Sequence, residues 1–146
     1  MNFIYKSIIT FFFVGNVQFA PGTIASMFAM LVWFFIPLNL FIQLSIILIL
    51  LLLALFLCYI HSTESDIEDP SYIVIDEVIG MFISLFMLPK QLSFYLLAFM
   101  LFRIFDILKP SIIYNAQDLK YGVGILADDI LAGLFTIIIL NSILFL

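Results

Sequence analysis

The sequence has a single cysteine, a single histidine and few charged residues of either sign. Cys58 can form no internal disulfide and no cysteine metal cluster, and its apolar surroundings fit a buried side chain. His61 closes the same apolar run and fits an interfacial histidine. With one histidine and no nucleophile elbow, a Ser-His-Asp hydrolase is not supported. The net charge of −5 argues against a nucleic-acid partner, because backbone phosphates need a basic surface.

Hydrophobic residues are abundant instead: they make up 66% of the 146 residues, and charged residues make up 10%. Soluble domains carry about 25% charged residues. The mean hydropathy of +1.31 is therefore typical of a protein that is surrounded largely by lipid. The length allows one domain, so we expect residues 1–146 to form a single membrane-embedded unit. The start of the chain is similar to a signal peptide, but Pro21 after Ala20 disfavours cleavage, and we expect it to be retained.

Apolar stretches alternate with polar breaks along the whole chain. Because a spanning helix needs about 20 apolar residues, the pattern predicts an all-α polytopic membrane helical bundle with about four to five membrane helices plus a short N-terminal helix. The first stretch is short and is expected to be tilted or re-entrant. The expected apolar stretches are Phe3–Gly15, Ile24–Ile36, Leu40–Ile60, Tyr72–Leu88, Gln91–Leu108 and Ile125–Leu146, with polar loops at 61–71 and 111–124 and a turn at Pro89–Lys90.

The alternation of helix directions brings polar residues from separate stretches to one side of the membrane. Following each helix across the bilayer places the following groups at one depth: Gly22–Thr23, Asp76–Glu77, Arg103–Asp106–Lys109 and Asp128–Asp129. Arg103, Lys109 and Lys120 would lie on this side and Lys90 on the other, and that balance favours the cytoplasmic face for the site.

Helical spacing sharpens this cluster. Arg103, Asp106 and Lys109 recur every three residues and therefore share one helix face. Asp76 precedes Gly80 by four residues, and Asp129 precedes Gly133 by the same interval. A glycine beside each acid would let a neighbouring helix approach closely.

Several carboxylates at one depth point to a hard divalent cation, because Mg²⁺ prefers oxygen ligands and would relieve their mutual repulsion. Cation and phosphate chemistry fit together here. Arg103 offers a planar fork for phosphate and Lys109 a point charge, and the backbone N–H groups near Gly22 and Thr23 start a helix that could hold an anion. We predict Asp76, Glu77, Asp128 and Asp129 as metal ligands.

Structural alternatives stay open for some of these residues. Asp128 and Asp129 would also serve as dipole partners in a first helical turn, and Arg103 with Asp106 would also serve as a structural ion pair. The loop acids Glu64, Asp66, Glu68 and Asp69 fit a solvated surface, and an approach of Glu64 and Asp69 to the metal is left open.

At these residues the chain resembles the phosphatidylglycerophosphatase A family of bacterial membrane lipid phosphatases. The matching strings are A-P-G-T-I-A-S (Ala20–Ser26), D-P-S-Y-I-V-I-D-E-V-I-G-M (Asp69–Met81), F-R-I-F-D-I-L-K-P (Phe102–Pro110) and G-V-G-I-L-A-D-D-I-L-A-G (Gly122–Gly133). The strings occur in family order and span most of the chain. The stretch before Asp69 departs from the family pattern because it is short and acidic.

The resemblance implies a Mg²⁺-dependent inner-membrane hydrolase that converts phosphatidylglycerophosphate to phosphatidylglycerol and phosphate. We expect direct hydrolysis by water, and an aspartyl-phosphate intermediate is the alternative. The residues expected to carry the reaction are Asp76, Asp106, Asp129 and Arg103, with Arg103, Lys109, Thr23 and Gly22 binding phosphate.

Two other classes compete with this hypothesis. A cation or proton transporter would also place acids in membrane helices, but at mid-depth rather than near one end. A CDP-alcohol phosphatidyltransferase would also use acids and Mg²⁺ on lipids, but its D-G-x-x-A-R string is absent.

Overall fold

The computed structural model describes residues 3–64, 70–120 and 122–144. The structure of these residues is helical and contains no strand, which confirms the all-α part of the predicted fold class. Asp66, Glu68 and Asp69 lie outside the described residues. The elements are α1 (Phe3–Ile9), the 3₁₀ turn η1 (Val14–Asn16), α2 (Pro21–Phe35), α3 (Leu40–Glu64), α4 (Ile75–Ser84), α5 (Leu92–Leu108), α6 (Ser111–Ala116) and α7 (Val123–Leu144).

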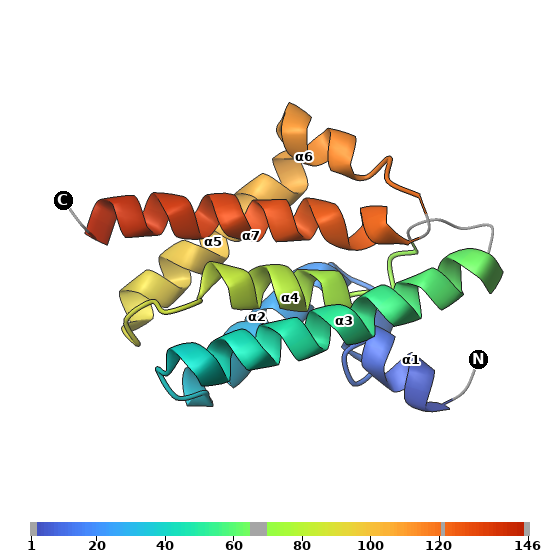
Figure 1. Ribbon diagram of the computed structural model, residues 1–146, viewed down its shortest axis with the longest axis horizontal. Coiled ribbons are helices and arrows are strands. Elements are labelled where there is room, and N and C mark those ends of the chain that lie inside the picture. The colour runs from blue at the N-terminus through green and yellow to red at the C-terminus, as the bar shows by residue number, and fades with distance from the viewer. Residues whose placement is uncertain (1–2, 65–69, 121, 145–146) are drawn as a thin grey trace.

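Helix α4 is the centre of the bundle. It packs most extensively against α7 and also contacts α2, α3 and α5. Figure 1 shows α4 between α7 and α3, with α5 crossing the bundle and leading into α6. Eight of the ten residues of α4 are buried, and the core beside it contains Trp33, Phe82 and Phe102. The Trp33 indole donates a hydrogen bond of 3.1 Å to the Leu85 carbonyl, which ties α2 to the end of α4.

Three helix boundaries differ from the expectation. Helix α2 begins at Pro21 rather than at Ile24, because proline is favoured in the first helical turn, where its missing N–H group is not needed. Helix α3 continues through Ile60 to Glu64. The expected helix 72–88 is limited to Ile75–Ser84. After the end of α4, Met87 has a positive φ of 57°. Its N–H group donates a 2.9 Å hydrogen bond to Gln43 Oε1 of α3, so the chain has left the helix at this residue.

The N-terminal stretch does not form one tilted helix over Phe3–Gly15. Helix α1 has only seven residues, and Phe11, Phe12 and Phe13 then turn the chain with positive φ angles. The prediction of a short N-terminal helix is confirmed. Helix α6 lies inside the expected loop 111–124 and follows Pro110, whose fixed φ suits the entry to a helix.

Among the described residues, two helices are long and apolar enough to cross a membrane: α3, with a mean hydropathy of 3.1, and α7, with 2.2. At about 1.5 Å per residue, α2 and α5 are shorter than a hydrocarbon core of about 30 Å, and α4 is shorter still. The expected count of four to five spans is therefore not confirmed. Helix α3 carries Phe41, Ile49 and Leu52 on its exposed face, a composition that suits contact with lipid.

Candidate active site

The close contact between α4 and α7 positions the acidic residues. Gly133 of α7 faces the Gly80 carbonyl of α4, and Gly80 in turn faces the Phe102 ring and the Asp129 carbonyl. A side chain at either glycine would push the helices apart. The prediction that these glycines allow a close approach is confirmed, and it places Asp76 and Asp129, each one turn before its glycine, on facing surfaces.

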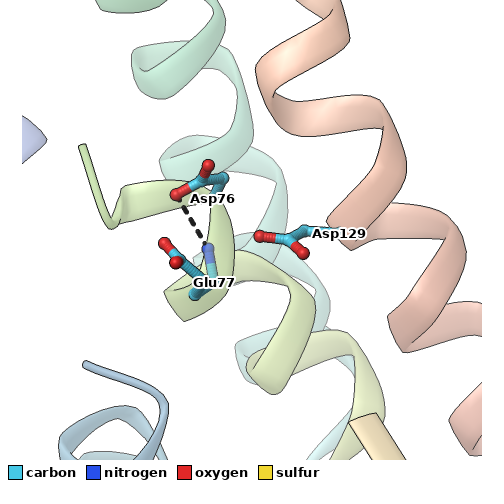
Figure 2. A group of neighbouring side chains, drawn as sticks. All are labelled: Asp76, Glu77 and Asp129. Atoms are coloured by element: carbon cyan, nitrogen blue, oxygen red, sulfur yellow. Dashed lines mark hydrogen bonds between the residues drawn. The ribbon is translucent and has the colours of Figure 1, made fainter. Parts of the chain in front are cut away.

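Three carboxylates meet at this contact. Asp76, Glu77 and Asp129 each offer an oxygen, and these oxygens lie within 4.8 Å of one another. Figure 2 shows Asp129 reaching from α7 toward the pair on α4. The side chains of Asp76 and Asp129 are buried, and Asp76 Oδ1 accepts a 3.0 Å hydrogen bond from the Glu77 N–H group. Like charges held this closely repel one another unless a cation or protons compensate them.

The first turn of α2 lies against Glu77. A β-carbon on Gly22 would coincide with the Glu77 carboxylate, so only glycine leaves room for that side chain. The Ser26 hydroxyl is already used, because it donates a 2.8 Å hydrogen bond to the Gly22 carbonyl. Thr23 is half-buried in the same turn. The structure thus brings Gly22, in the first turn of α2, to the acidic group, and the N-terminal end of a helix carries partial positive charge there.

Helix α5 contributes a cation and a fourth acid. Arg103 Nη1 lies 2.5 Å from Asp106 Oδ2, in a geometry that is an ion pair rather than a hydrogen bond. Asp106 is within electrostatic reach of Glu77 and Asp129. The ion pair that the sequence left open as structural is present, and it stands beside the three carboxylates.

Lys109 and Asp128 form a separate ion pair beside the three carboxylates. Lys109 follows the end of α5 in the left-handed conformation, and its Nζ atom donates a 2.6 Å hydrogen bond to Asp128 Oδ2. The same oxygen accepts a 2.9 Å hydrogen bond from Gln117 Nε2. Burial lowers the pKa of Lys109, but the hydrogen bond and charge of Asp128, with Asp106 and Asp129 nearby, outweigh it, so the pKa is raised. Lys109 therefore stays cationic.

Two predicted residues take positions that the sequence did not specify. Asp128 was predicted to share the metal site, yet among the described residues the carboxylates within 4.8 Å are those of Asp76, Glu77 and Asp129. Glu64 is exposed at the end of α3 and does not join this group. Gln117 was missed, because the expected loop 111–124 gave no local signal that its amide would meet Asp128.

Buried polar atoms that make no hydrogen bond are concentrated here. In the described part of the chain they are Glu77 Oε2, Asp128 Oδ1, Asp129 Oδ1, Arg103 Nε and Arg103 Nη1. Burying such an atom without a partner costs about 1–3 kcal/mol, and more for a charged group. The acceptors suit a cation and the donors suit an anion, so the set suits the two ions bound together. The three clustered carboxylates have the hard oxygen donors that Mg²⁺ requires, so the residues present fit this ion.

Comparisons with known proteins show what the chain is similar to. The family model described as Phosphatidylglycerophosphatase A matches residues 7–144. A Bacteroides thetaiotaomicron protein with the provisional name phosphatidylinositol-3-phosphatase is 35% identical over 134 residues, which cover 86% of this chain and 84% of that protein. The Escherichia coli phosphatidylglycerophosphatase A is 33% identical over 84% of this chain and 73% of its own length. The Haemophilus influenzae phosphatidylglycerophosphatase A is 40% identical over 63% of this chain and 58% of its own length. No solved structure matches the chain.

Proposed function

The chain belongs to the phosphatidylglycerophosphatase A family of phosphoric monoester hydrolases, and from that premise we propose that it hydrolyses phosphatidylglycerophosphate to phosphatidylglycerol and phosphate. The reaction would take place where α2, α4, α5 and α7 meet. A membrane protein of this family fits the two long apolar helices. We further propose a multi-pass protein of the bacterial cytoplasmic membrane, with its site on the cytoplasmic face.

One observation carries the proposal: buried carboxylate oxygens without partners lie beside a buried guanidinium whose Nε and Nη1 atoms also lack hydrogen bonds among the described residues. A phosphate monoester bound with a divalent cation supplies both missing partners. The anion would accept hydrogen bonds from the guanidinium, and the cation would neutralise the carboxylates. Few other ligands satisfy donors and acceptors of this kind at one buried site.

Asp76, Glu77 and Asp129 would hold a Mg²⁺ ion, which supplies Lewis-acid stabilisation of phosphoryl charge and a lowered pKa of water. Arg103 would bind the phosphate oxygens through its planar fork. Asp106, paired with Arg103, would fix the guanidinium and orient the attacking water. Lys109 would add a second positive charge, and the first turn of α2 at Gly22 and Thr23 would add backbone donors. The acyl chains of the substrate would stay in lipid.

Direct attack by water is our proposal for the chemical step. In that step an oxygen–phosphorus bond forms from water as the bond to the glycerol oxygen breaks, and the leaving oxygen takes up a proton. Trapping a phosphorylated aspartate or glutamate during turnover would overturn direct attack without affecting the substrate assignment.

A second substrate is favoured by one relative. The Bacteroides protein, whose provisional name specifies phosphatidylinositol 3-phosphate, aligns with 86% of this chain. Both lipids are phosphate monoesters on a diacylglycerol phosphodiester, so the same donors would bind either one. Their headgroups differ in bulk, since one carries glycerol and the other an inositol ring.

The test is phosphate release by the purified protein in mixed micelles, with phosphatidylglycerophosphate, phosphatidylinositol 3-phosphate and phosphatidic acid supplied separately. We expect release from phosphatidylglycerophosphate with Mg²⁺, loss of release with a chelator, and recovery when Mg²⁺ is returned. Faster release from the inositol lipid would replace the assigned substrate. Activity that persists in chelator would remove the metal from the mechanism, and no release from any of the three lipids would overturn the proposed function.

A further inference from the structure

The carboxylate of Asp128 is engaged on one oxygen by two donors from different elements. Lys109 Nζ donates from the end of α5 over 2.6 Å, and Gln117 Nε2 donates from the end of α6 over 2.9 Å, both to Oδ2. The side chain of Asp128 is 6% exposed and that of Lys109 is 24% exposed. The Asp128 carboxylate is therefore the buried member of this ion pair, and the Lys109 ammonium is its more exposed member.

Adjacent residues of α7 face different neighbours. Consecutive residues of a helix point about 100° apart, so Asp129 can face α4 while Asp128 faces the ends of α5 and α6. Among the described residues, the carboxylates close enough to share a cation include Asp129 and not Asp128. Asp128 and Asp129 are neighbours of the same residue type, yet they have different contacts.

The ammonium of Lys109 lies within electrostatic reach of Asp106 and Asp129 and is bonded to Asp128. An ammonium carries three donors, and one of them is used by Asp128. The remaining donors would be available to an oxyanion bound beside the carboxylates. Because the lysine side chain is flexible, the position of the Lys109 ammonium depends on its hydrogen bond to Asp128.

We infer that Asp128 and Gln117 are positioning residues that hold the Lys109 ammonium at the entrance of the site for the substrate phosphate, and that Asp128 is not a metal ligand. The inference rests on the proposed function for the identity of the phosphate. Gln117 fixes Asp128 through a neutral amide donor, and Asp128 fixes Lys109 through an ion pair. Loss of either should weaken substrate binding and leave cation binding intact.

The test compares variants by two separate readouts. The first is the affinity of the purified protein for Mn²⁺, measured by electron paramagnetic resonance without substrate. The second is the division between kcat and KM for phosphate release. For Gln117→Ala we expect KM to rise about two- to tenfold, less than the loss of a direct contact to the phosphate would cause, because Gln117 acts on the phosphate only through Asp128 and Lys109. We expect kcat and Mn²⁺ affinity to stay within about twofold of the parent. A rise in KM alone indicates lost binding shared by ground and transition states.

Asp128→Asn should raise KM further and also leave Mn²⁺ affinity within about twofold, whereas Asp129→Asn should weaken Mn²⁺ binding at least tenfold. Asn115→Ala is the matched control, because Asn115 is an exposed amide of α6 two residues from Gln117; it should change neither readout. Asp128→Glu, which keeps the carboxylate, should give a KM between that of the parent and that of Asp128→Asn.

Loss of Mn²⁺ affinity in Asp128→Asn equal to that in Asp129→Asn would overturn the inference, and so would a fall in kcat with unchanged KM in Gln117→Ala. If the parent protein bound Mn²⁺ but released no phosphate from any lipid, the proposed function would fail. The Mn²⁺ comparison would still decide whether Asp128 is a ligand, and binding of orthophosphate to the Mn²⁺-loaded protein would replace KM as the second readout.

Discussion

The carbonyl oxygen of Gly80 lies 2.5 Å from the point that a β-carbon on Gly133 would occupy. Backbone therefore meets backbone where α4 crosses α7, and Ile83 Cβ lies 3.1 Å from the same point. Since Asp76 and Asp129 stand one helical turn away on the same two helices, this contact sets the distance between the acids.

Gly133→Ala should therefore destabilise the protein. Alanine favours a helix over glycine by about 1 kcal/mol, but the added methyl group would force α4 and α7 apart at a cost of about 1–3 kcal/mol. We expect a lower thermal midpoint in detergent and weaker Mn²⁺ binding, measured by circular dichroism and electron paramagnetic resonance. Leu134→Ala, at the neighbouring exposed position, should leave Mn²⁺ binding unchanged. A Gly133→Ala protein as stable as the parent would contradict the backbone contact.

Gly22→Ala should give the opposite balance of effects. The new methyl group would meet the Glu77 carboxylate, which is the far end of a flexible side chain and can swing away at little cost. Stability should change little, while displacement of Glu77 lowers activity about tenfold or more. Kinetics with Mg²⁺ titration and thermal unfolding measure the two effects. Met27→Ala, exposed on the same helix, is the control, and full activity in Gly22→Ala would show that Glu77 is not required where it lies.

The acidic group should trade stability for activity. Asp129→Asn removes one of three crowded carboxylates, which relieves like-charge repulsion when no cation is bound. In chelator we expect a higher thermal midpoint than that of the parent protein, together with loss of at least about 99% of phosphate release in Mg²⁺. Glu64→Gln should do neither, because Glu64 is exposed at the end of α3. A less stable Asp129→Asn protein in chelator would indicate that the carboxylate is held by partners rather than strained.

Adjacency of the polar groups was predictable, and their partners were not. Alternation of apolar stretches predicted that polar groups from α2, α4, α5 and α7 would gather together, and the four-residue spacing from Asp76 to Gly80 and from Asp129 to Gly133 anticipated the α4–α7 contact. Neither pattern shows how each helix is rotated about its axis relative to its neighbours. The separation of Asp128 from Asp129 and the bond to Gln117 depend on where α6 lies, and that helix occupies a stretch with no apolar periodicity. The end of α4 depends on Gln43, 44 residues away in sequence.

Arg103→Lys should lower kcat/KM about ten- to a hundredfold even though the charge is kept. Lysine replaces a planar fork with a point charge, and the Nε and Nη1 donors, which make no hydrogen bond among the described residues, would lose their joint geometry toward phosphate. Hydrogen bonds to charged groups are worth about 1.5–3 kcal/mol, which sets this range. Lys90→Arg is the matched control, since Lys90 donates to the Phe34 carbonyl over 2.7 Å near the opposite ends of α2 and α4. Equal rates for Arg103→Lys and the parent would show that charge alone suffices.

Membrane topology can be tested through the two ends of α5. This helix has 17 residues, so it rises about 25 Å, close to the hydrocarbon thickness of about 30 Å; α4 has ten residues and rises only about 15 Å. If both helices cross with help from their flanking turns, Lys90 and Asp118 lie on opposite faces. In a Cys58→Ala background, cysteines introduced as Asp118→Cys and Lys90→Cys should react with an impermeant maleimide only from the cytoplasmic and only from the external face, respectively. Labelling of both cysteines from the cytoplasmic face would contradict two crossings and would show that α4 and α5 form a re-entrant hairpin. The Pro89–Lys90 turn would then not reach the far face, because α4 is too short.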